Sequence, residues 1–194
     1  ILAALDKPTS GQVFLNMMDI VAIREKDIAA FRRDNLGFVF QDFNLLDTFS
    51  VQDNILLPLV LSGRPFREME EKLKPLAARL GIAEISGGQK QRTAVARALI
   101  TAPQLVLADE PTGALDSKAT DSLLRLFAQI NAAGQTILMV THSAKAASHA
   151  GRVLFIRDGQ VFHQLYRGES TDSQLYQKIA DTLTLLATGG EAGA

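Results

Sequence analysis

The chain contains no cysteine, no long basic block and no long apolar run. Without cysteine it cannot form disulfides, thiolate metal sites or cysteine nucleophiles, and this composition fits a reducing compartment. A net charge of −1 gives no indication of a nucleic-acid-binding surface, so we expect no nucleic-acid partner. The longest apolar run, residues 55–61, is interrupted by Pro58 and is too short to span a bilayer. No signal peptide is visible, although the sequence begins at Ile1 rather than at methionine.

The sequence is nevertheless rich enough in apolar residues to build a core. It has 194 residues, of which 47% are apolar, so one folded domain is expected rather than a disordered chain. Periodicity predicts the strands and helices that follow. The predicted strands are residues 12–16, 36–41, 105–108 and 136–140, with a hairpin over 153–162. The predicted helices are residues 27–33, 54–61, 66–80, 117–133 and 175–186, and residues 1–5 are compatible with a helix.

The most informative stretch is residues 105–112. Four apolar residues predict a strand that is buried on both faces, and Asp109 and Glu110 follow it directly. Open α/β sheets bind ligands at the carboxyl ends of their strands, so this stretch suits a Mg-nucleotide site. There Asp109 would hold the metal and Glu110 would polarise an attacking water. Pro111 disfavours helical backbone at Glu110, which predicts an extended turn. On its own, the stretch fits a solvated acidic turn equally well.

Two further side chains are expected near the same edge. Gln41 ends the apolar strand 36–41, where its amide oxygen can bind Mg²⁺ or hold a water; alone, it fits an ordinary loop residue better. His142 follows the strand 136–140. Because residues 105–140 read as a βαβ unit that returns to a neighbouring parallel strand, we expect Glu110 and His142 to share one sheet edge.

A Ser-Gly-Gly turn precedes a strongly helical run at residues 93–100. Ser86 is a good N-cap candidate, and Gly87 and Gly88 would let backbone N–H groups approach an oxyanion. The helix dipole would add to the attraction for phosphate. Taken alone, the turn fits a capped helix start without a ligand.

Residues 42–51 are unusually apolar for a loop. Most large apolar residues are buried, so about half of this segment's apolar side chains are expected in the core. The rest would form a docking surface for a partner, because exposed apolar patches mark interfaces. The apolar side chains concerned are Phe43, Leu45, Leu46 and Phe49.

Five motifs in sequence order resemble those of the ATP-binding cassette (ABC) ATPases. Gln41 resembles the Q-loop glutamine, and residues 85–89, with Ser86, Gly87, Gly88 and Gln89, resemble the signature motif. Residues 105–110 resemble the Walker B motif, with Glu110 as its catalytic glutamate. Residues 113–116 resemble the D-loop, and residues 140–142 resemble the segment that carries the switch histidine, here His142. Each motif is modest alone, but five in the family's order over essentially the whole chain are specific.

This resemblance implies an α/β fold of the P-loop NTPase type. A parallel sheet core with flanking helices would carry an inserted helical subdomain and an antiparallel β element. The ABC ATPase domain is expected over residues 1–165, with its core at 1–41 and 101–165 and the helical subdomain at about 42–100. A C-terminal helix and a flexible tail would occupy residues 166–194.

The resemblance also implies a mechanism and partners. Two copies would meet head to tail around two ATP molecules, with Ser86, Gly87, Gly88 and Gln89 of one copy contacting the nucleotide of the other. Asp109 and Gln41 would attend Mg²⁺, Glu110 would orient the water, and His142 would steady the γ-phosphate. Asp116 would link the two sites. A membrane permease would dock near residues 41–51 at the cytoplasmic face of the membrane, and a sensor histidine kinase is a further candidate partner.

Within the family, residues 38–47 and 108–117 look most like the ATPase subunits of bacitracin-type antimicrobial-peptide resistance transporters. Lipoprotein release, macrolide export and cell division remain alternatives, because the motifs are shared. A DNA-maintenance ATPase would insert a long coiled coil between the Q-loop and the signature motif. Only 45 positions separate Gln41 from Ser86, and they contain no sustained heptads.

The sequence departs from the family pattern at two points. The Walker A loop is absent, and only Ala83 and Glu84 join the preceding segment to the signature motif, where relatives have a longer connection. We expect that residues are missing from the sequence at both loops; an intact mass near 21.0 kDa would contradict this. If nothing is missing, the chain lacks the loop that cradles the phosphates, and a non-catalytic interaction module becomes the alternative.

Overall fold

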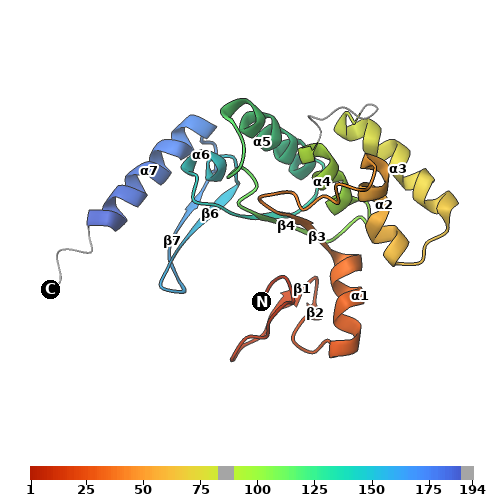
Figure 1. The fold of residues 1–194 in the computed structure, drawn as a ribbon. Coiled ribbons are helices and arrows are strands. Elements are labelled where there is room, and N and C mark those ends of the chain that lie inside the picture. Colours follow the sequence, from red (N-terminus) through yellow and green to blue (C-terminus); the bar gives the residue numbers. More distant parts are fainter. Residues whose placement is uncertain (83–89, 189–194) are drawn as a thin grey trace. The chain divides into compact units, whose positions relative to one another are not determined.

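The structure, a computed structural model, describes residues 1–82 and 90–188 and divides into two compact units, Ile1–Val140 and Thr141–Ala194 (Figure 1). The described elements of the first unit are β1 (Phe14–Leu15), β2 (Met18–Asp19), α1 (Glu25–Asn35), β3 (Leu36–Val39), α2 (Val51–Leu61), α3 (Phe66–Leu80), α4 (Lys90–Leu99), β4 (Leu105–Asp109), α5 (Ser117–Ala132) and β5 (Ile137–Val140). Those of the second are α6 (Ala144–Ala147), β6 (Arg152–Arg157), β7 (Gln160–Tyr166) and α7 (Asp172–Thr188).

A three-stranded parallel sheet, in the order β3-β4-β5, forms the centre of the first unit. Val39 pairs with Ala108, and Asp109 pairs with Val140. The chain passes from β4 through α5 to β5, which confirms the predicted βαβ unit. Because the strands are parallel, their carboxyl ends lie at the same edge of the sheet.

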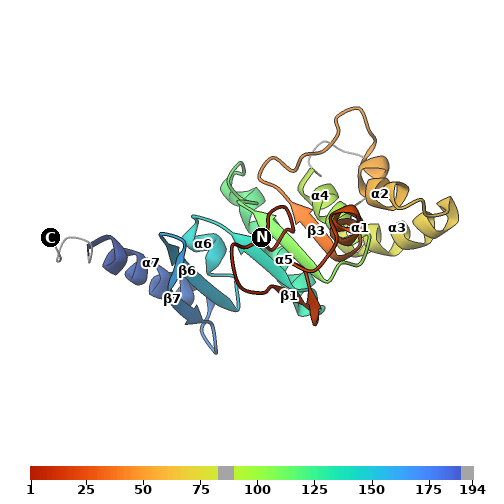
Figure 2. The same cartoon turned by 90° about the horizontal axis from the view of Figure 1, so that it is seen from below.

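Alternate residues of the central strands pack into two different cores, since successive side chains of a strand point to opposite faces. Val39, Val106 and Ala108 lie in a core with α2, α4 and α5. Leu105 and Leu107 pack with α1 and the N-terminal segment on the other face. Figures 1 and 2 show α4 and α5 on one side of the sheet and α1 on the other. The sheet is therefore covered on both faces, as the continuous apolar runs predict.

Helix α4 lies directly on β3. A methyl group at Gly37 of β3 would stand 2.3 Å from the carbonyl oxygen of Ala98 in α4, well inside van der Waals contact. The two backbones can approach this closely only because residue 37 has no side chain.

Helix α3 has the bounds that its periodicity predicts. Of the predicted apolar stripe, Met69 and Leu80 are buried, and Leu73 and Leu76 pack against the same core. The helix ends at Gly81, whose φ of +62° is left-handed, so a glycine closes it at little conformational cost. The amphipathic pattern therefore found both the helix and its buried face.

The N-terminal segment differs from its prediction. Residues 1–5 form a turn, in which the Ala4 N–H donates to the Ile1 carbonyl at 2.8 Å, and not a helix. Five residues provide too few hydrogen bonds to offset the entropy of helix nucleation. Beyond them, only Phe14–Leu15 of the predicted strand 12–16 is paired, with Met18–Asp19.

The second unit is built on the predicted hairpin. β6 pairs antiparallel with β7, and Asp158 and Gly159 between them both have left-handed φ, of +50° and +76°. Asp-Gly is a favoured sequence for this kind of tight turn. Leu175 and Ile179 of α7 are buried against this hairpin. None of the described helices is long and apolar enough to cross a membrane. The domain boundaries expected from the resemblance remain a prediction.

Candidate active site

The acidic pair lies at the carboxyl edge of the parallel sheet. Asp109 is the last residue of β4 and is exposed. The backbone N–H of Glu110 donates to the Val140 carbonyl at 2.9 Å, so pairing with β5 continues one residue beyond the strand. The sheet therefore fixes the backbone of both acids at the edge where open α/β sheets bind ligands.

The backbone of Glu110 corrects one prediction. Its φ is +42°, which is left-handed rather than extended. Pro111 disfavours the right-handed helical region for the residue before it, yet the chain must reverse immediately after Asp109. The reversal is closed by the Gly113 N–H, which donates to the Glu110 carbonyl at 2.9 Å. A left-handed non-glycine residue costs about 1–2 kcal/mol, and buried Pro111 and Thr112 hold the turn in place.

The Gln41 side chain lies against this turn. Gln41 follows β3 by two residues, and a methyl group at Gly113 would stand 3.2 Å from both its Cδ and its Nε2. The absence of a side chain at Gly113 thus leaves room for the amide. The structure brings together Gln41 and the turn that begins at Glu110, two of the segments that the sequence predicts for the site.

Asp116 has a structural role that the sequence analysis missed. Its Oδ1 accepts a hydrogen bond from the Ala119 N–H at 2.7 Å, which caps the N-terminus of α5. An aspartate directly before a predicted helix is the signal that could have found this. The Asp116 side chain is exposed, and its role at a dimer interface stays a prediction.

Two substitutions at this position separate the cap from any other role. Asp116→Ala removes the acceptor and is expected to lower the free energy of unfolding by about 1 kcal/mol, whereas Asp116→Asn retains a good N-cap and should change it little. Urea unfolding of both variants measures the difference. Equal stability of the two variants would contradict the cap. Loss of ATP hydrolysis in Asp116→Asn, although its stability is unchanged, would point to the interface role.

The structure leaves two predictions untested. Ser86, Gly87, Gly88 and Gln89 lie outside the described residues, and α4 begins at Lys90, directly after them. His142 is exposed and is the second residue of the second unit. The register brings Val140, two residues before it, beside Asp109. The pairing of His142 with Glu110 remains a prediction.

The apolar segment after Gln41 divides as expected. Phe43 is buried and Leu45 packs against the core of the first unit. Leu46 and Phe49 are each 43% exposed. Half of these large side chains therefore contribute to the core, and half are available to a partner.

A buried amide that the sequence analysis did not single out shapes the same segment. Asn54 of α2 accepts a hydrogen bond from the Leu46 N–H at 2.8 Å. Its Nδ2 donates to the carbonyls of Leu46, Phe49 and Ser50 at 3.0, 3.3 and 3.1 Å. The signal in the sequence is an asparagine directly before the apolar run 55–61, since a polar group that is buried with such a run needs hydrogen-bond partners.

The side chains at the edge fit a magnesium ion that is shared with phosphates. Mg²⁺ prefers oxygen ligands and usually takes only one or two from the protein, with waters and substrate phosphates as the others. Asp109 and Gln41 offer a carboxylate and an amide oxygen. No three His, Cys, Asp or Glu residues gather as a metal site within residues 1–82 and 90–188. The donor set therefore suits a nucleotide-bound ion better than an all-protein cage.

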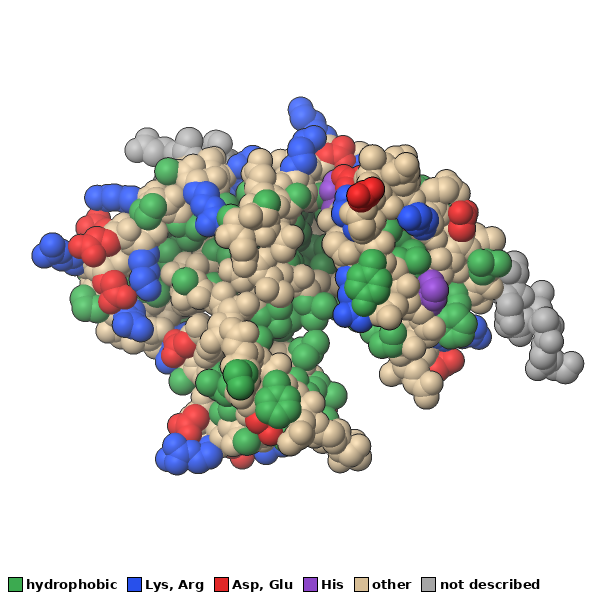
Figure 3. Space-filling view, turned by 180° about the vertical axis from the view of Figure 1, so that it is seen from behind, with side chains coloured by type: hydrophobic (Ala, Val, Ile, Leu, Met, Phe, Trp, Pro, Cys, Tyr) green, Lys and Arg blue, Asp and Glu red, His purple; other side chains and the backbone are tan. Residues whose placement is uncertain are grey.

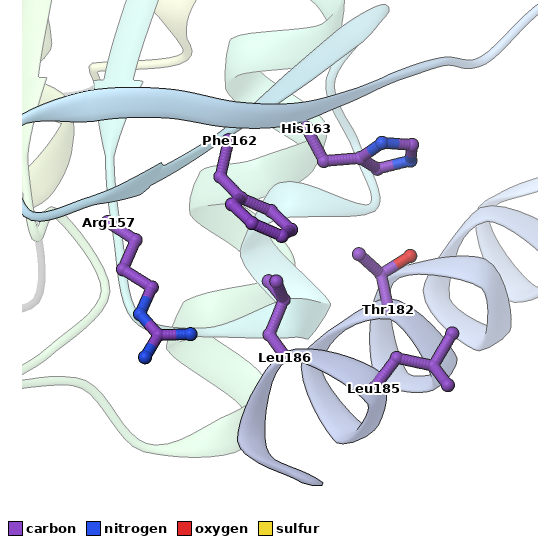
Figure 4. A pocket seen from close by; sticks show the side chains of 6 residues that line it. All are labelled: Arg157, Phe162, His163, Thr182, Leu185 and Leu186. Atoms are coloured by element: carbon purple, nitrogen blue, oxygen red, sulfur yellow. The ribbon is translucent and has the colours of Figure 1, made fainter. Parts of the chain in front are cut away.

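A separate hollow lies in the second unit, between the β6–β7 hairpin and α7. Its volume is about 290 Å³, and it is lined by Arg157, Phe162, His163, Thr182, Leu185 and Leu186 (Figure 4). None of the residues predicted for the site lines it. On the face shown in Figure 3, Lys and Arg side chains are interspersed with Asp and Glu, in line with the balanced net charge.

Comparison with known proteins assigns the family. The profile described as ABC transporter matches residues 1–113. The chain is 49% identical to "Uncharacterized ABC transporter ATP-binding protein YvcR" of Bacillus subtilis, over 98% of this chain and 76% of that protein. It is 44% identical to "Bacitracin export ATP-binding protein BceA" of Halalkalibacterium halodurans, over 96% of this chain and 77% of that protein. The chain belongs to the ABC transporter family, as an ATP-binding subunit.

A solved structure supports the fold. "Dimeric Structure of MJ0796, a Bacterial ABC Transporter Cassette" is 34% identical and superimposes with a TM-score of 0.71, over 85% of this chain and 77% of that one. The parallel sheet with its helices and antiparallel strands is therefore the ABC ATPase fold, which confirms the predicted fold class. The alignment with YvcR runs over 201 positions and uses 98% of the 194 residues here, so about eleven positions of that relative face no residue of this chain.

Proposed function

We propose that this chain binds ATP with Mg²⁺ and hydrolyses it to power a membrane permease that protects the cell against bacitracin-like peptides. One observation carries the ATPase part of the proposal, and the 44% identity to a bacitracin export ATP-binding protein supports the cargo. The carboxyl ends of β3 and β4 share a sheet edge, and there the amide of Gln41 lies against the turn that begins at Glu110. This edge thus offers the Glu110 carboxylate as a proton acceptor, and oxygen atoms of Asp109 and Gln41 as ligands for a metal ion.

Each residue has a role in this reaction. The Glu110 carboxylate accepts a hydrogen bond from the attacking water and orients its oxygen toward the γ-phosphorus. A phosphorus–oxygen bond to the water forms while the bond to the leaving ADP oxygen breaks. The water passes a proton to the Glu110 carboxylate, which returns it to the phosphate or to solvent as ADP and phosphate leave. Asp109 and Gln41 would hold Mg²⁺, which, when bound, neutralises charge on the phosphates. His142 donates a hydrogen bond to the γ-phosphate.

The proposal includes two partners. A second copy supplies Ser86, Gly87, Gly88 and Gln89 to the nucleotide, in keeping with a similar cassette that is described as dimeric. The exposed side chains of Leu46 and Phe49 contact the permease, because they follow Gln41 closely and would otherwise leave apolar surface in water. The chain then acts at the cytoplasmic face of the membrane.

The phosphate-cradling loop is the remaining part of the proposal. We infer that it belongs to the natural protein, together with a longer link before Ser86. About eleven positions of YvcR have no counterpart in this chain, which fits the inference that this chain is shorter than that relative within the aligned region. The intact mass of the natural protein tests both parts.

Survival of a bacitracin-sensitive host tests the transport role. The full gene product, produced together with its permease, is expected to raise the bacitracin concentration that the host tolerates. Glu110→Gln should abolish this protection, whereas Glu169→Gln, a matched change at an exposed glutamate, should retain it. Protection against a macrolide in place of bacitracin would overturn the proposed cargo but would leave the proposed ATP hydrolysis in place.

A further inference from the structure

An arginine of α4 reaches the segment that follows Gln41. Arg97 donates two hydrogen bonds to consecutive backbone carbonyls, from Nη2 to Phe43 and from Nη1 to Asn44, both at 2.6 Å. The planar guanidinium presents two parallel N–H groups, so it can hold both carbonyls at once. These contacts join residues more than fifty positions apart in the chain.

The carbonyls that Arg97 holds belong to an unusual piece of backbone. Phe43 and Asn44 have φ values of +59° and +44°, so two non-glycine residues in succession are left-handed. The Phe43 N–H also donates to the Phe40 carbonyl at 3.0 Å, which closes a turn around Gln41. Such a conformation persists only where the surrounding structure determines it, and Arg97 supplies a contact that does so.

The other end of this arrangement is fixed as well. Ala98, the residue after Arg97, lies against Gly37 of β3 with no room for a side chain between them. Val39 at the end of β3 is fully buried. Gln41 therefore lies between two points that α4 holds, the strand before it and the carbonyls of Phe43 and Asn44 after it.

The guanidinium has given up part of its hydration to make these contacts. Burial lowers the pKa of Arg97 from its ordinary value, because removal from water disfavours the charged form. Two carbonyl oxygens replace the lost water. A flexible contact at the surface would leave the guanidinium hydrated and would not replace its water by carbonyl oxygens.

We propose that Arg97 is a positioning residue for ATP hydrolysis, which sets the place of the Gln41 amide by holding the backbone of Phe43 and Asn44. This inference rests on the proposed role of Gln41. It assigns to α4 a second task besides packing on the sheet. The two described hydrogen bonds of Arg97 go to the backbone of Phe43 and Asn44, so we expect its effect on the reaction to pass through the turn.

A double-mutant cycle on the full protein tests the proposal. Arg97→Met keeps the length and apolar contacts of the stem but loses both hydrogen bonds. We expect it to lower kcat by about 10- to 100-fold, with little change in the KM for ATP, because misplacement of a group near the reaction affects the chemical step. Combined with Gln41→Ala, it should lower kcat no further than Gln41→Ala alone. Arg97→Lys should recover part of the rate, and Arg125→Met, at an exposed arginine, should have no effect.

Hydrogen exchange of the same variants provides a readout that does not depend on catalysis. In Arg97→Met, amides of residues 42–46 should exchange faster, while those of β4 keep their wild-type rates and thermal unfolding shows an intact fold. Unchanged exchange in residues 42–46, or rate losses that multiply in the double variant, would overturn the proposal. If the wild-type protein hydrolyses no ATP, the proposed function fails. Faster exchange in residues 42–46 would then still support the contact of Arg97 with the turn.

Discussion

Glu110→Gln is expected to lower the rate of ATP hydrolysis by about 10²- to 10⁴-fold, the range that a positioned acid–base group contributes. The amide has nearly the shape of the carboxylate, but it carries no charge and accepts a proton far less readily. Backbone pairing of residue 110 with Val140 and the left-handed φ are unchanged by the substitution, since both belong to the main chain. Release of inorganic phosphate at saturating ATP measures the rate.

Binding should survive in the same variant. Asp109 and Gln41 remain, so ATP is expected to bind with little change in affinity and to hold two copies together, which equilibrium binding and size-exclusion chromatography report. Glu169→Gln controls for the loss of one negative charge. Hydrolysis at the wild-type rate would remove Glu110 from the reaction, and loss of ATP binding would show that the carboxylate acts mainly on the nucleotide.

Gly37→Ala is expected to lower the free energy of unfolding by about 1–3 kcal/mol, as overpacking of a close-packed core does. The new methyl group would stand 2.3 Å from the Ala98 carbonyl oxygen and 3.0 Å from its carbonyl carbon. Both are backbone atoms, so the clash is relieved only if α4 moves away from β3. Urea unfolding measures the loss.

A second glycine provides the control for this substitution. An added methyl group at Gly151 would meet no atom within 4 Å. Gly151→Ala should therefore change stability by no more than about 0.5 kcal/mol, as surface substitutions usually do. Equal stability of both variants would show that α4 does not lie on β3 as described. A stable Gly37→Ala protein with reduced ATP hydrolysis would instead indicate that the helix has moved and carried Arg97 with it.

Local sequence patterns predicted the strand that carries the acids better than they predicted the backbone conformation of the turn after it. The run of residues 105–108 identified a strand with two covered faces, and Asp109 lies at its carboxyl end as expected. The predicted extended conformation of Glu110 was wrong. The rule for residues before proline disfavours the right-handed helical region but does not choose between the extended and left-handed regions. That choice depended on the turn closed by Gly113.

The sequence alone determined the family and most of the strands and helices of the first unit, and it supplied the acids and the amide of the candidate site, because each motif and each periodic segment is made of residues that are close together in the chain. Only the tertiary structure decided that Gln41 lies against Gly113, that Gly37 must lack a side chain, and that Arg97 holds the turn after Gln41. Such contacts join residues tens of positions apart, and no local periodicity encodes which of many possible partners packing will select.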